Sequence, residues 1–304
     1  MTVPAHPTRG WVLLLAAAVG VTGALAGCGR SDRTATVAAQ VTELNRNTVA
    51  LPAVSIELLQ PGAGPLVHYT AAPRKPAAQQ VTVHVHRDMQ QQVGERTPQH
   101  FLTPDVTLGL RATSVAHGVE LQLGEVSSSE PALTGKLGAV AGARAAVATD
   151  RNGSPTAFTL ITDTETDGDV RTSLERCLTD VMAQAMPMPD APIGKGAVWV
   201  VHRKVPGRLP LEQVTRATLT SVADGHLRVE LRITENVVTS RHIERAGIAP
   251  APDDPVHGTG FLVIDPALPL PLNGAVSIAG TRTYRDHAGT LQVRQATMTS
   301  VHWG

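Results

Sequence analysis

The sequence has no excess of charge of either sign and very few aromatic residues. Its 304 residues include 26 Lys and Arg and 26 Asp and Glu, which gives a formal net charge of +0. Proteins that bind nucleic acid through its phosphates need a clear excess of Lys and Arg, so the composition predicts no nucleic-acid partner. Aromatic residues make up only 3% of the chain, which leaves few rings on which bases or sugars could stack.

Cysteine is also scarce, with two in the chain. Cys28 follows an apolar stretch near the N-terminus, and Cys177 lies beside Leu174 and Leu178 in a helical pattern. If Cys28 is modified, Cys177 has no partner, so we expect no internal disulfide. A thiol among apolar neighbours is typical of a small core residue rather than a reactive group.

The N-terminal segment has the composition of a secretory leader. Arg9 supplies a positive charge, and the apolar run Trp11–Ala26 contains Gly20 and Gly23. This run is too short and too glycine-rich for a good membrane-spanning helix. It ends in Leu25-Ala26-Gly27-Cys28, a tetrapeptide that resembles the lipobox of bacterial lipoproteins.

The lipobox resemblance implies that the chain is cleaved before Cys28 and carries a thioether-linked diacylglycerol there, often with an added N-acyl chain. Two or more acyl chains hold a protein stably on a membrane. The resemblance therefore implies a membrane partner and a location outside the cytoplasm, on the outer face of the cell membrane. We expect three regions: a signal peptide at 1–27, a lipidated cysteine with a flexible tether at 28–52, and a β-rich domain at 53–304.

Alternation of apolar and polar residues with a period of two begins near Ala53 and predicts β-strands. In the stretch Val81–His86 three valines share one face, and His84 and His86 share the other. Asp150–Gly153 contains Asn-Gly, which accepts the positive φ of a tight hairpin turn. The predicted fold is mainly β: two similar antiparallel meanders in a curved sheet, half-barrel or sandwich, with one connecting helix.

The two halves of the domain, about 53–165 and 190–304, resemble each other in sequence. Matching segments occur in the same order, which favours a duplication over chance. They are Val85-His86-Arg87 with Val201-His202-Arg203, Thr113–Gly118 with Thr220–Gly225, Val119–Leu121 with Val229–Leu231, Glu125 with Glu235, and the turns at Gly153 and Gly289.

A helix near 170–186 is predicted to join the halves, because Leu174, Cys177, Leu178 and Val181 recur at helical spacing. The Pro-rich and Gly-rich stretch Pro187–Trp199 follows it. Prolines end the helix and glycines permit a tight entry into the next strand. We expect Trp199 to be buried at the start of the second meander.

An acidic run precedes this helix and carries the candidate calcium ligands, which are Asp163, Glu165, Asp167 and Asp169. Oxygen ligands at alternate positions with a glycine at the sixth match the first half of a calcium loop. Leu174 stands where the loop needs its bidentate glutamate. This departure favours the simpler interpretation, in which negative charge stabilises a helix N-terminus.

Two histidines on one strand face, His84 and His86, could chelate a metal, but the sequence supplies no third ligand. No nucleophile elbow, S-x-x-K, H-E-x-x-H, phosphate loop or dinucleotide fingerprint is present. The sequence therefore predicts a non-enzymatic protein with no catalytic residues, no cofactor and no metal site beyond the calcium candidates above.

The stretch Pro187–Trp199 resembles one in a poorly characterised group of β-rich lipoproteins typical of actinobacteria. More remotely, the lipid anchor and strand meander are similar to half-barrel lipoproteins that carry lipids across bacterial envelopes. These resemblances imply an envelope protein that binds or carries a lipid or another hydrophobic molecule. One alternative is a scaffolding or protein-interaction lipoprotein with a filled core, and another is a hydrolase with an unfamiliar site.

Overall fold

The computed structural model describes residues 44–69, 77–205, 211–238, 248–250, 255–286, 288 and 291–304. The predicted signal peptide, Cys28 and most of the predicted tether lie outside these residues, as does Gly289. Within the described part of the chain, no helix is long and apolar enough to cross a membrane.

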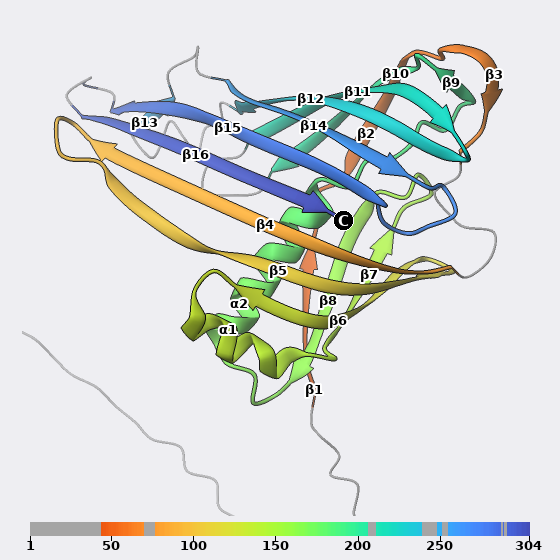
Figure 1. Cartoon of the computed structure of the whole chain (residues 1–304). Coiled ribbons are helices and arrows are strands. Elements are labelled where there is room, and N and C mark those ends of the chain that lie inside the picture. The colour runs from red at the N-terminus through yellow and green to blue at the C-terminus, as the bar shows by residue number, and fades with distance from the viewer. Residues whose placement is uncertain are drawn as a thin grey trace, which may run out of the picture. The chain divides into compact units, whose positions relative to one another are not determined.

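The described strands are antiparallel, and all but two of them belong to one sheet (Figure 1). From edge to edge its order is β1 (Leu44–Ala50), β8 (Pro155–Asp163), β7 (Arg144–Thr149), β6 (Gly118–Ser128), β5 (Gln99–Val115), β4 (Ala78–Val93), β16 (Gln292–Trp303), β15 (Asn273–Asp286), β14 (Val256–Ile264), β12 (His226–Val237), β11 (Leu211–Ala223), β10 (Val198–Val205) and β2 (Val54–Gln60). The short β13 (Ile248–Pro250) pairs with β15, and β3 (Ala63–Val67) pairs with β9 (Ile193–Lys195).

The sheet contains two meanders, β4–β8 and β10–β16, in agreement with the predicted fold class. They join where β16 pairs with β4, from Val293 opposite Val93 to Trp303 opposite Val83. The two meanders therefore form one curved, open sheet with β1 and β2 at its edges.

The predicted connecting helix is present as α2 (Gly168–Ala183). Its buried face includes Leu174, Cys177, Leu178 and Val181. This face packs against the concave side of the sheet, where Val81, Val83 and Val85 of β4 belong to the same hydrophobic core. Figure 1 shows α2 behind β4 and β5, and the helix contacts β4 and β8.

A second helix, α1 (Pro131–Leu137), is followed by a single 3₁₀ turn at Gly138–Val140. The sequence pattern predicted neither of these elements. The only residue of α1 that is buried is Leu137. A seven-residue helix with one buried side chain has no apolar stripe for a periodicity search to detect.

The predicted tether extends too far, because Leu44–Ala50 within 28–52 forms the edge strand β1. It pairs with β8 from Leu44 opposite Asp163 to Ala50 opposite Ala157. Only two of its residues, at positions 45 and 49, are partly buried. The strand is held mainly through its backbone, so its sequence carries no alternating pattern.

The matched segments Thr113–Gly118 and Thr220–Gly225 fall on equivalent hairpins, β5–β6 and β11–β12. The other matches are less regular. Val119 is opposite Ser114, whereas Val229 is opposite Leu219 beyond a bulge, so the two triplets lie at different distances from their turns. Glu125 is exposed although Glu235 is buried, so these glutamates are not structural equivalents.

Candidate functional site

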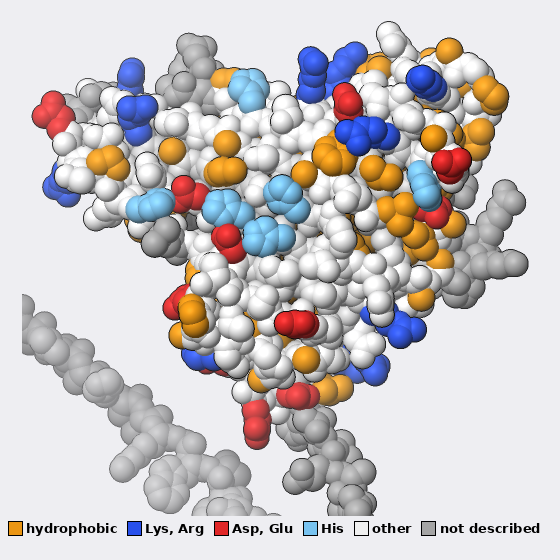
Figure 2. Space-filling model, in the orientation of Figure 1, with side chains coloured by type: hydrophobic (Ala, Val, Ile, Leu, Met, Phe, Trp, Pro, Cys, Tyr) orange, Lys and Arg blue, Asp and Glu red, His pale blue; other side chains and the backbone are white. Residues whose placement is uncertain are grey.

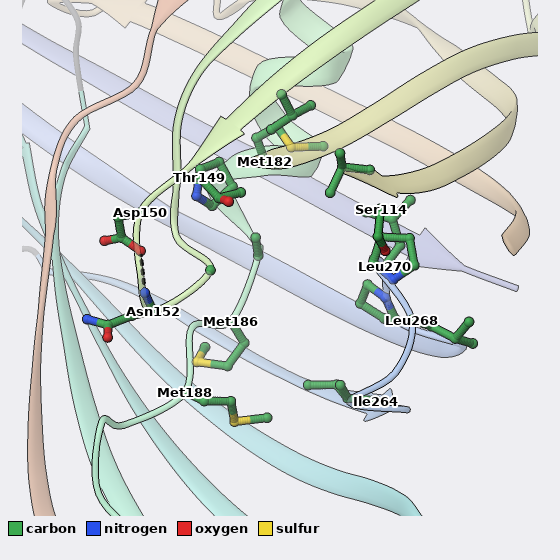
Figure 3. Close-up of a pocket in the computed structure, with 18 of the residues that line it drawn as sticks. Ser114, Thr149, Asp150, Asn152, Met182, Met186, Met188, Ile264, Leu268 and Leu270 are labelled. Atoms are coloured by element: carbon green, nitrogen blue, oxygen red, sulfur yellow. Dashed lines mark hydrogen bonds between the residues drawn. The ribbon is translucent and has the colours of Figure 1, made fainter. Parts of the chain in front are cut away.

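A largely apolar cavity of about 380 Å³ lies between the C-terminal end of α2 and the ends of several strands (Figure 3). Its wall comes from the β5–β6 and β7–β8 hairpins, the chain after α2, the loop between β14 and β15, and the end of β16. Its apolar lining includes Leu121, Val181, Met182, Met186, Met188 and Leu270.

Three methionines from the end of α2 and the chain after it form one side of the cavity. They are Met182, Met186 and Met188, and Figure 3 shows Leu268 and Leu270 on the opposite side. Methionine side chains are flexible and polarizable, so they adapt to ligands of different shape. These three are half of the six methionines in the chain, and their clustering within seven residues is the feature of the sequence that marks this wall of the cavity.

The loop after β14 is held in place by a buried glutamine. Gln79 of β4 accepts a hydrogen bond from the backbone N–H of Leu270 at 3.1 Å and donates one to the carbonyl of Pro271 at 3.1 Å. Gln79 is 8% exposed, so these bonds are sheltered from water. Gln79 therefore fixes the part of the cavity wall formed by the loop between β14 and β15.

Polar groups in the cavity wall fall into two kinds. Ser114 Oγ and Trp303 Nε1 are buried and have no hydrogen-bond partner among the described residues. Asp150 is satisfied, because its Oδ1 accepts from the backbone N–H groups of Asn152 at 2.9 Å and Ser154 at 2.8 Å. The exposed side chains of His117 and Arg151 lie at the rim.

Ser114, His117 and Asp150 are residue types of a hydrolytic triad, and they line the same cavity. No hydrogen bond joins any two of them in the described structure, and Asp150 is engaged in its own turn. A nucleophile, its base and the residue that orients the base normally lie within hydrogen-bond reach of one another. These three side chains are therefore not linked as a nucleophile, base and orienting acid in the described structure.

The helix that forms part of this cavity is fixed by an ion pair with the sheet. Arg87 of β4 donates from Nε to Asp180 Oδ2 at 2.5 Å and from Nη2 to Oδ1 of the same carboxylate. Burial raises the pKa of Asp180 above its ordinary value, and the hydrogen bond from Arg87 opposes this shift. The bidentate contact fixes the rotation of α2 against β4.

The second meander also contacts the end of this helix. Arg203 of β10 donates from Nη2 to the carbonyl of Ala185 at 3.0 Å and from Nη1 to Gln213 Oε1 at 3.3 Å. Burial lowers the pKa of Arg203 to about 10. The hydrogen-bonded network extends from Gln213 to two further buried side chains. Glu235 accepts a hydrogen bond from Gln213 at 2.9 Å and another from Arg282 at 2.8 Å.

The candidate calcium ligands Asp163, Glu165, Asp167 and Asp169 run from the end of β8 into the first turn of α2. Asp167 caps the helix, since its carboxylate accepts from the backbone N–H of Asp169 at 2.8 Å, and it contacts Lys136 Nζ at 2.9 Å. These bonds lower the pKa of Asp167. In the described part of the chain, no group of three or more His, Cys, Asp or Glu side chains could hold a metal ion.

His84 and His86 lie on the outer face of the sheet, where Figure 2 shows histidines gathered over β4, β5 and β16. His86 Nδ1 is 2.6 Å from Asp105 Oδ1, and His84 Nδ1 is 3.1 Å from Thr107 Oγ1. The two side chains are 43% and 35% exposed. Their partners are thus residues of the neighbouring strand, and both histidines lie on the face of β4 opposite the buried Val81, Val83 and Val85.

Two predictions about buried residues are confirmed. Cys177 is a free cysteine with 7% of its surface exposed, and burial raises its pKa to about 12. Trp199 has no exposed surface and donates from Nε1 to the carbonyl of Pro187 at 3.2 Å. Gly196 enters β10 with a φ of 85°, as expected for the tight turn before Trp199.

Comparison with known protein families and with curated proteins gives no match for this sequence.

Proposed function

We propose that this protein is a non-enzymatic lipoprotein of the cell envelope that binds a hydrophobic molecule in the cavity beside α2. The observation that carries the proposal is a largely apolar cavity of about 380 Å³ in the concave side of the sheet. That volume lies within the usual range of small-molecule sites, roughly 300–1,000 Å³, and such sites are mostly apolar with a few polar groups.

The apolar lining of the cavity, more than its volume, favours ligand binding over the scaffolding alternative, because other hollows of about 400–540 Å³ in the described structure have mixed polar and apolar linings. An empty apolar cavity of about 150 Å³ is already large enough to bind benzene, and this one is more than twice as large. A protein whose core serves only for stability has few voids larger than a water molecule. An apolar chain from a lipid is the occupant whose chemistry fits the methionine and leucine wall.

Attachment to the membrane is the second part of the proposal and rests on the sequence Leu25-Ala26-Gly27-Cys28. Cleavage before Cys28 and acylation of its sulfur would place the β-rich domain outside the cytoplasm, next to a source of lipid. Replacing Cys28 with alanine should leave an uncleaved precursor or release the protein. Membrane-bound Cys28→Ala protein with a normally processed N-terminus would contradict the anchor.

Native mass spectrometry of the purified protein tests ligand binding directly. We expect a population whose mass exceeds that of the lipidated chain, and organic extraction should recover an intact hydrophobic molecule from it. Recovery of only the hydrolysis products of an added ester would contradict the non-enzymatic part. A protein that carries no ligand and takes up none from added lipid would support the scaffolding alternative.

A matched pair of variants locates the site. Met186→Glu places a carboxylate in the cavity wall, whereas Met298→Glu makes the same change at a residue of β16 that is 38% exposed. Met186 is partly exposed in the empty cavity, and an apolar ligand would cover the new carboxylate. Burying an unpaired charge is strongly unfavourable, so Met186→Glu should abolish ligand uptake while Met298→Glu retains it. Melting temperatures of both variants check that the fold is kept. Equal uptake by the two variants would place the ligand elsewhere.

A further inference from the structure

Three exposed arginines line a hollow of about 540 Å³ on the outer face of the second meander. Arg216 belongs to β11, and Arg228 and Arg232 belong to β12. Side chains alternate between the two faces of a strand. Val229 and Leu231, which flank these positions along β12, are buried in the core, so the arginines of β12 point away from it. The sheet itself therefore separates this hollow from the cavity beside α2.

Arg216 and Arg232 face each other directly across β11 and β12. In such a pair the Cβ atoms lie about 4.5–5.5 Å apart, and two like charges destabilise the sheet. Among the described residues Glu230 is the one acid that lines the hollow, and no ion pair joins it to any of the three arginines. The hollow therefore carries an excess of two positive charges with which no described acid pairs.

An aromatic ring on the next strand positions the third arginine. The guanidinium carbon of Arg228 lies 4.3 Å from the centroid of the Phe261 ring of β14. A cation–π contact does not neutralise a guanidinium group, so Arg228 keeps its charge and its capacity to donate to an acceptor. Thr218 and Thr259 also line the hollow, and their hydroxyls can donate as well. The hollow therefore presents three guanidinium groups and two hydroxyls to an anion.

We propose that this hollow binds a phosphate group, which Arg216 and Arg232 hold from two sides while Arg228 binds a further oxygen. Guanidinium groups bind phosphate oxygens in a bidentate manner. A phosphate monoester carries a charge of about −1.5 to −2 at pH 7, which matches the excess charge of the hollow, whereas a carboxylate has only one charge and two oxygens. A soluble phosphate and the headgroup of a phospholipid share this chemistry. Binding here is independent of the cavity, because the two sites lie on opposite faces of the sheet.

Isothermal titration calorimetry of the mature lipidated protein, in a non-ionic detergent at constant ionic strength, tests the site with two probes. Inorganic phosphate represents a soluble source. Glycerophosphoglycerol, a phospholipid headgroup without acyl chains, represents a lipid source and offers no chain to the apolar cavity. We expect saturable binding of a single phosphate per chain and much weaker binding of acetate. Tighter binding of glycerophosphoglycerol than of phosphate would assign the site to a lipid headgroup, and the reverse order would assign it to a soluble phosphate.

Two double variants with the same loss of charge locate the binding. Arg216→Gln with Arg232→Gln removes two cations from the hollow, whereas Arg46→Gln with Arg144→Gln removes two exposed arginines of β1 and β7. A hydrogen bond to a charged group changes affinity by about tenfold or more. The hollow variant should therefore bind phosphate about a hundredfold more weakly, and the control variant should bind it like the wild type.

The melting temperatures of the same proteins separate binding from a structural role. A ligand that binds the folded state raises the melting temperature by mass action, so phosphate should stabilise the wild type and the control variant but not the hollow variant. Without phosphate the hollow variant should melt no lower than the wild type, because it has lost a pair of like charges.

Absence of saturable binding of both probes would overturn the phosphate site. Equal weakening in the two double variants would also overturn it, because binding would then follow overall charge. Equal affinity for acetate and phosphate would show that the hollow does not select a phosphate group. A hollow variant that melts well below the wild type without phosphate would show that the two arginines stabilise the sheet and do not await an anion. Uptake of a hydrophobic ligand by the cavity is measured separately, so each of these results leaves it standing.

Discussion

Arg87 and Arg203 occupy the same place in the two Val-His-Arg triplets, and both contact the helical connection between the meanders. Arg87 binds the Asp180 carboxylate within α2, and Arg203 binds the carbonyl of Ala185 just after it. In each triplet the preceding histidine contacts an acid on the next strand: His86 contacts Asp105, and His202 lies 3.5 Å from Glu212. The triplets therefore place one arginine from each meander on the segment that lines the cavity.

Arg87→Met should destabilise the fold most strongly near neutral pH. The substitution leaves the Asp180 carboxylate, which is 8% exposed, without its cation. Removing one partner of a buried pair costs about 3–5 kcal/mol, and the low end applies because Arg87 is 34% exposed. Burial raises the pKa of Asp180 even when Arg87 is present, so without Arg87 the pKa rises further.

The raised pKa of Asp180 determines how the stability of Arg87→Met changes with pH. A carboxyl group whose folded pKa lies above its unfolded value takes up a proton on folding. Its stabilising effect is complete below the unfolded pKa and is lost as the pH rises through the folded pKa. Urea unfolding of Arg87→Met should therefore show partial recovery as the pH falls toward about 4. Arg203→Met is the matched control, since Arg203 faces a carbonyl. Equal pH dependence in both variants would argue against the ion pair.

Glu235→Leu should cost far more stability than Glu125→Leu, although the two glutamates match in sequence. Glu235 accepts from Arg282 and Gln213 inside the sheet, whereas Glu125 is exposed. Breaking the buried pair should lower the free energy of unfolding by about 3–5 kcal/mol. The exposed substitution should change it by about 0.5 kcal/mol or less. Chemical denaturation compares the two, and similar losses would mean that the buried network contributes little.

The sequence predicted the features that depend on the local order of apolar and polar residues. The alternation of Val81, Val83 and Val85 predicted the inward face of β4, and the helical spacing around Cys177 predicted α2. It did not predict contacts between distant residues. Arg87 and Asp180 are 93 positions apart, and nothing near either residue indicates that they meet. The cavity was missed for the same reason, because its wall is assembled from turns and strand ends between Tyr69 and Trp303.

Trp199→Ala should lower the free energy of unfolding by about 3–5 kcal/mol, as expected for truncation of a fully buried ring. Trp199→Phe keeps most of the packing and loses only the hydrogen bond to Pro187, so it should cost about 1–2 kcal/mol. In a Trp303→Phe background, Trp199 fluorescence should be blue-shifted and resist acrylamide quenching with or without lipid. Red-shifted, freely quenched emission would show that the ring is exposed in solution.

Cys177 should be inert to alkylation in the folded protein. Its sulfur is buried, and burial raises its pKa to about 12, so almost none of the reactive thiolate is present near neutral pH. A Cys28→Ala chain has Cys177 as its only thiol. We expect iodoacetamide to label this chain rapidly in urea and very slowly without it. Rapid labelling without urea would show that the face of α2 against the sheet opens readily.

The same group should weaken the fold at alkaline pH. The thiol has a pKa of 9.0 when unfolded and about 12 when folded, so the folded state retains a proton that the unfolded state loses. Its stabilising effect is therefore complete below pH 9.0 and declines as the pH rises through the folded value. Cys177→Ala removes this contribution, so its free energy of unfolding should fall less steeply above that pH than the wild-type value. Parallel curves for the two proteins would mean that the sulfur ionises as readily in the folded chain as in the unfolded one.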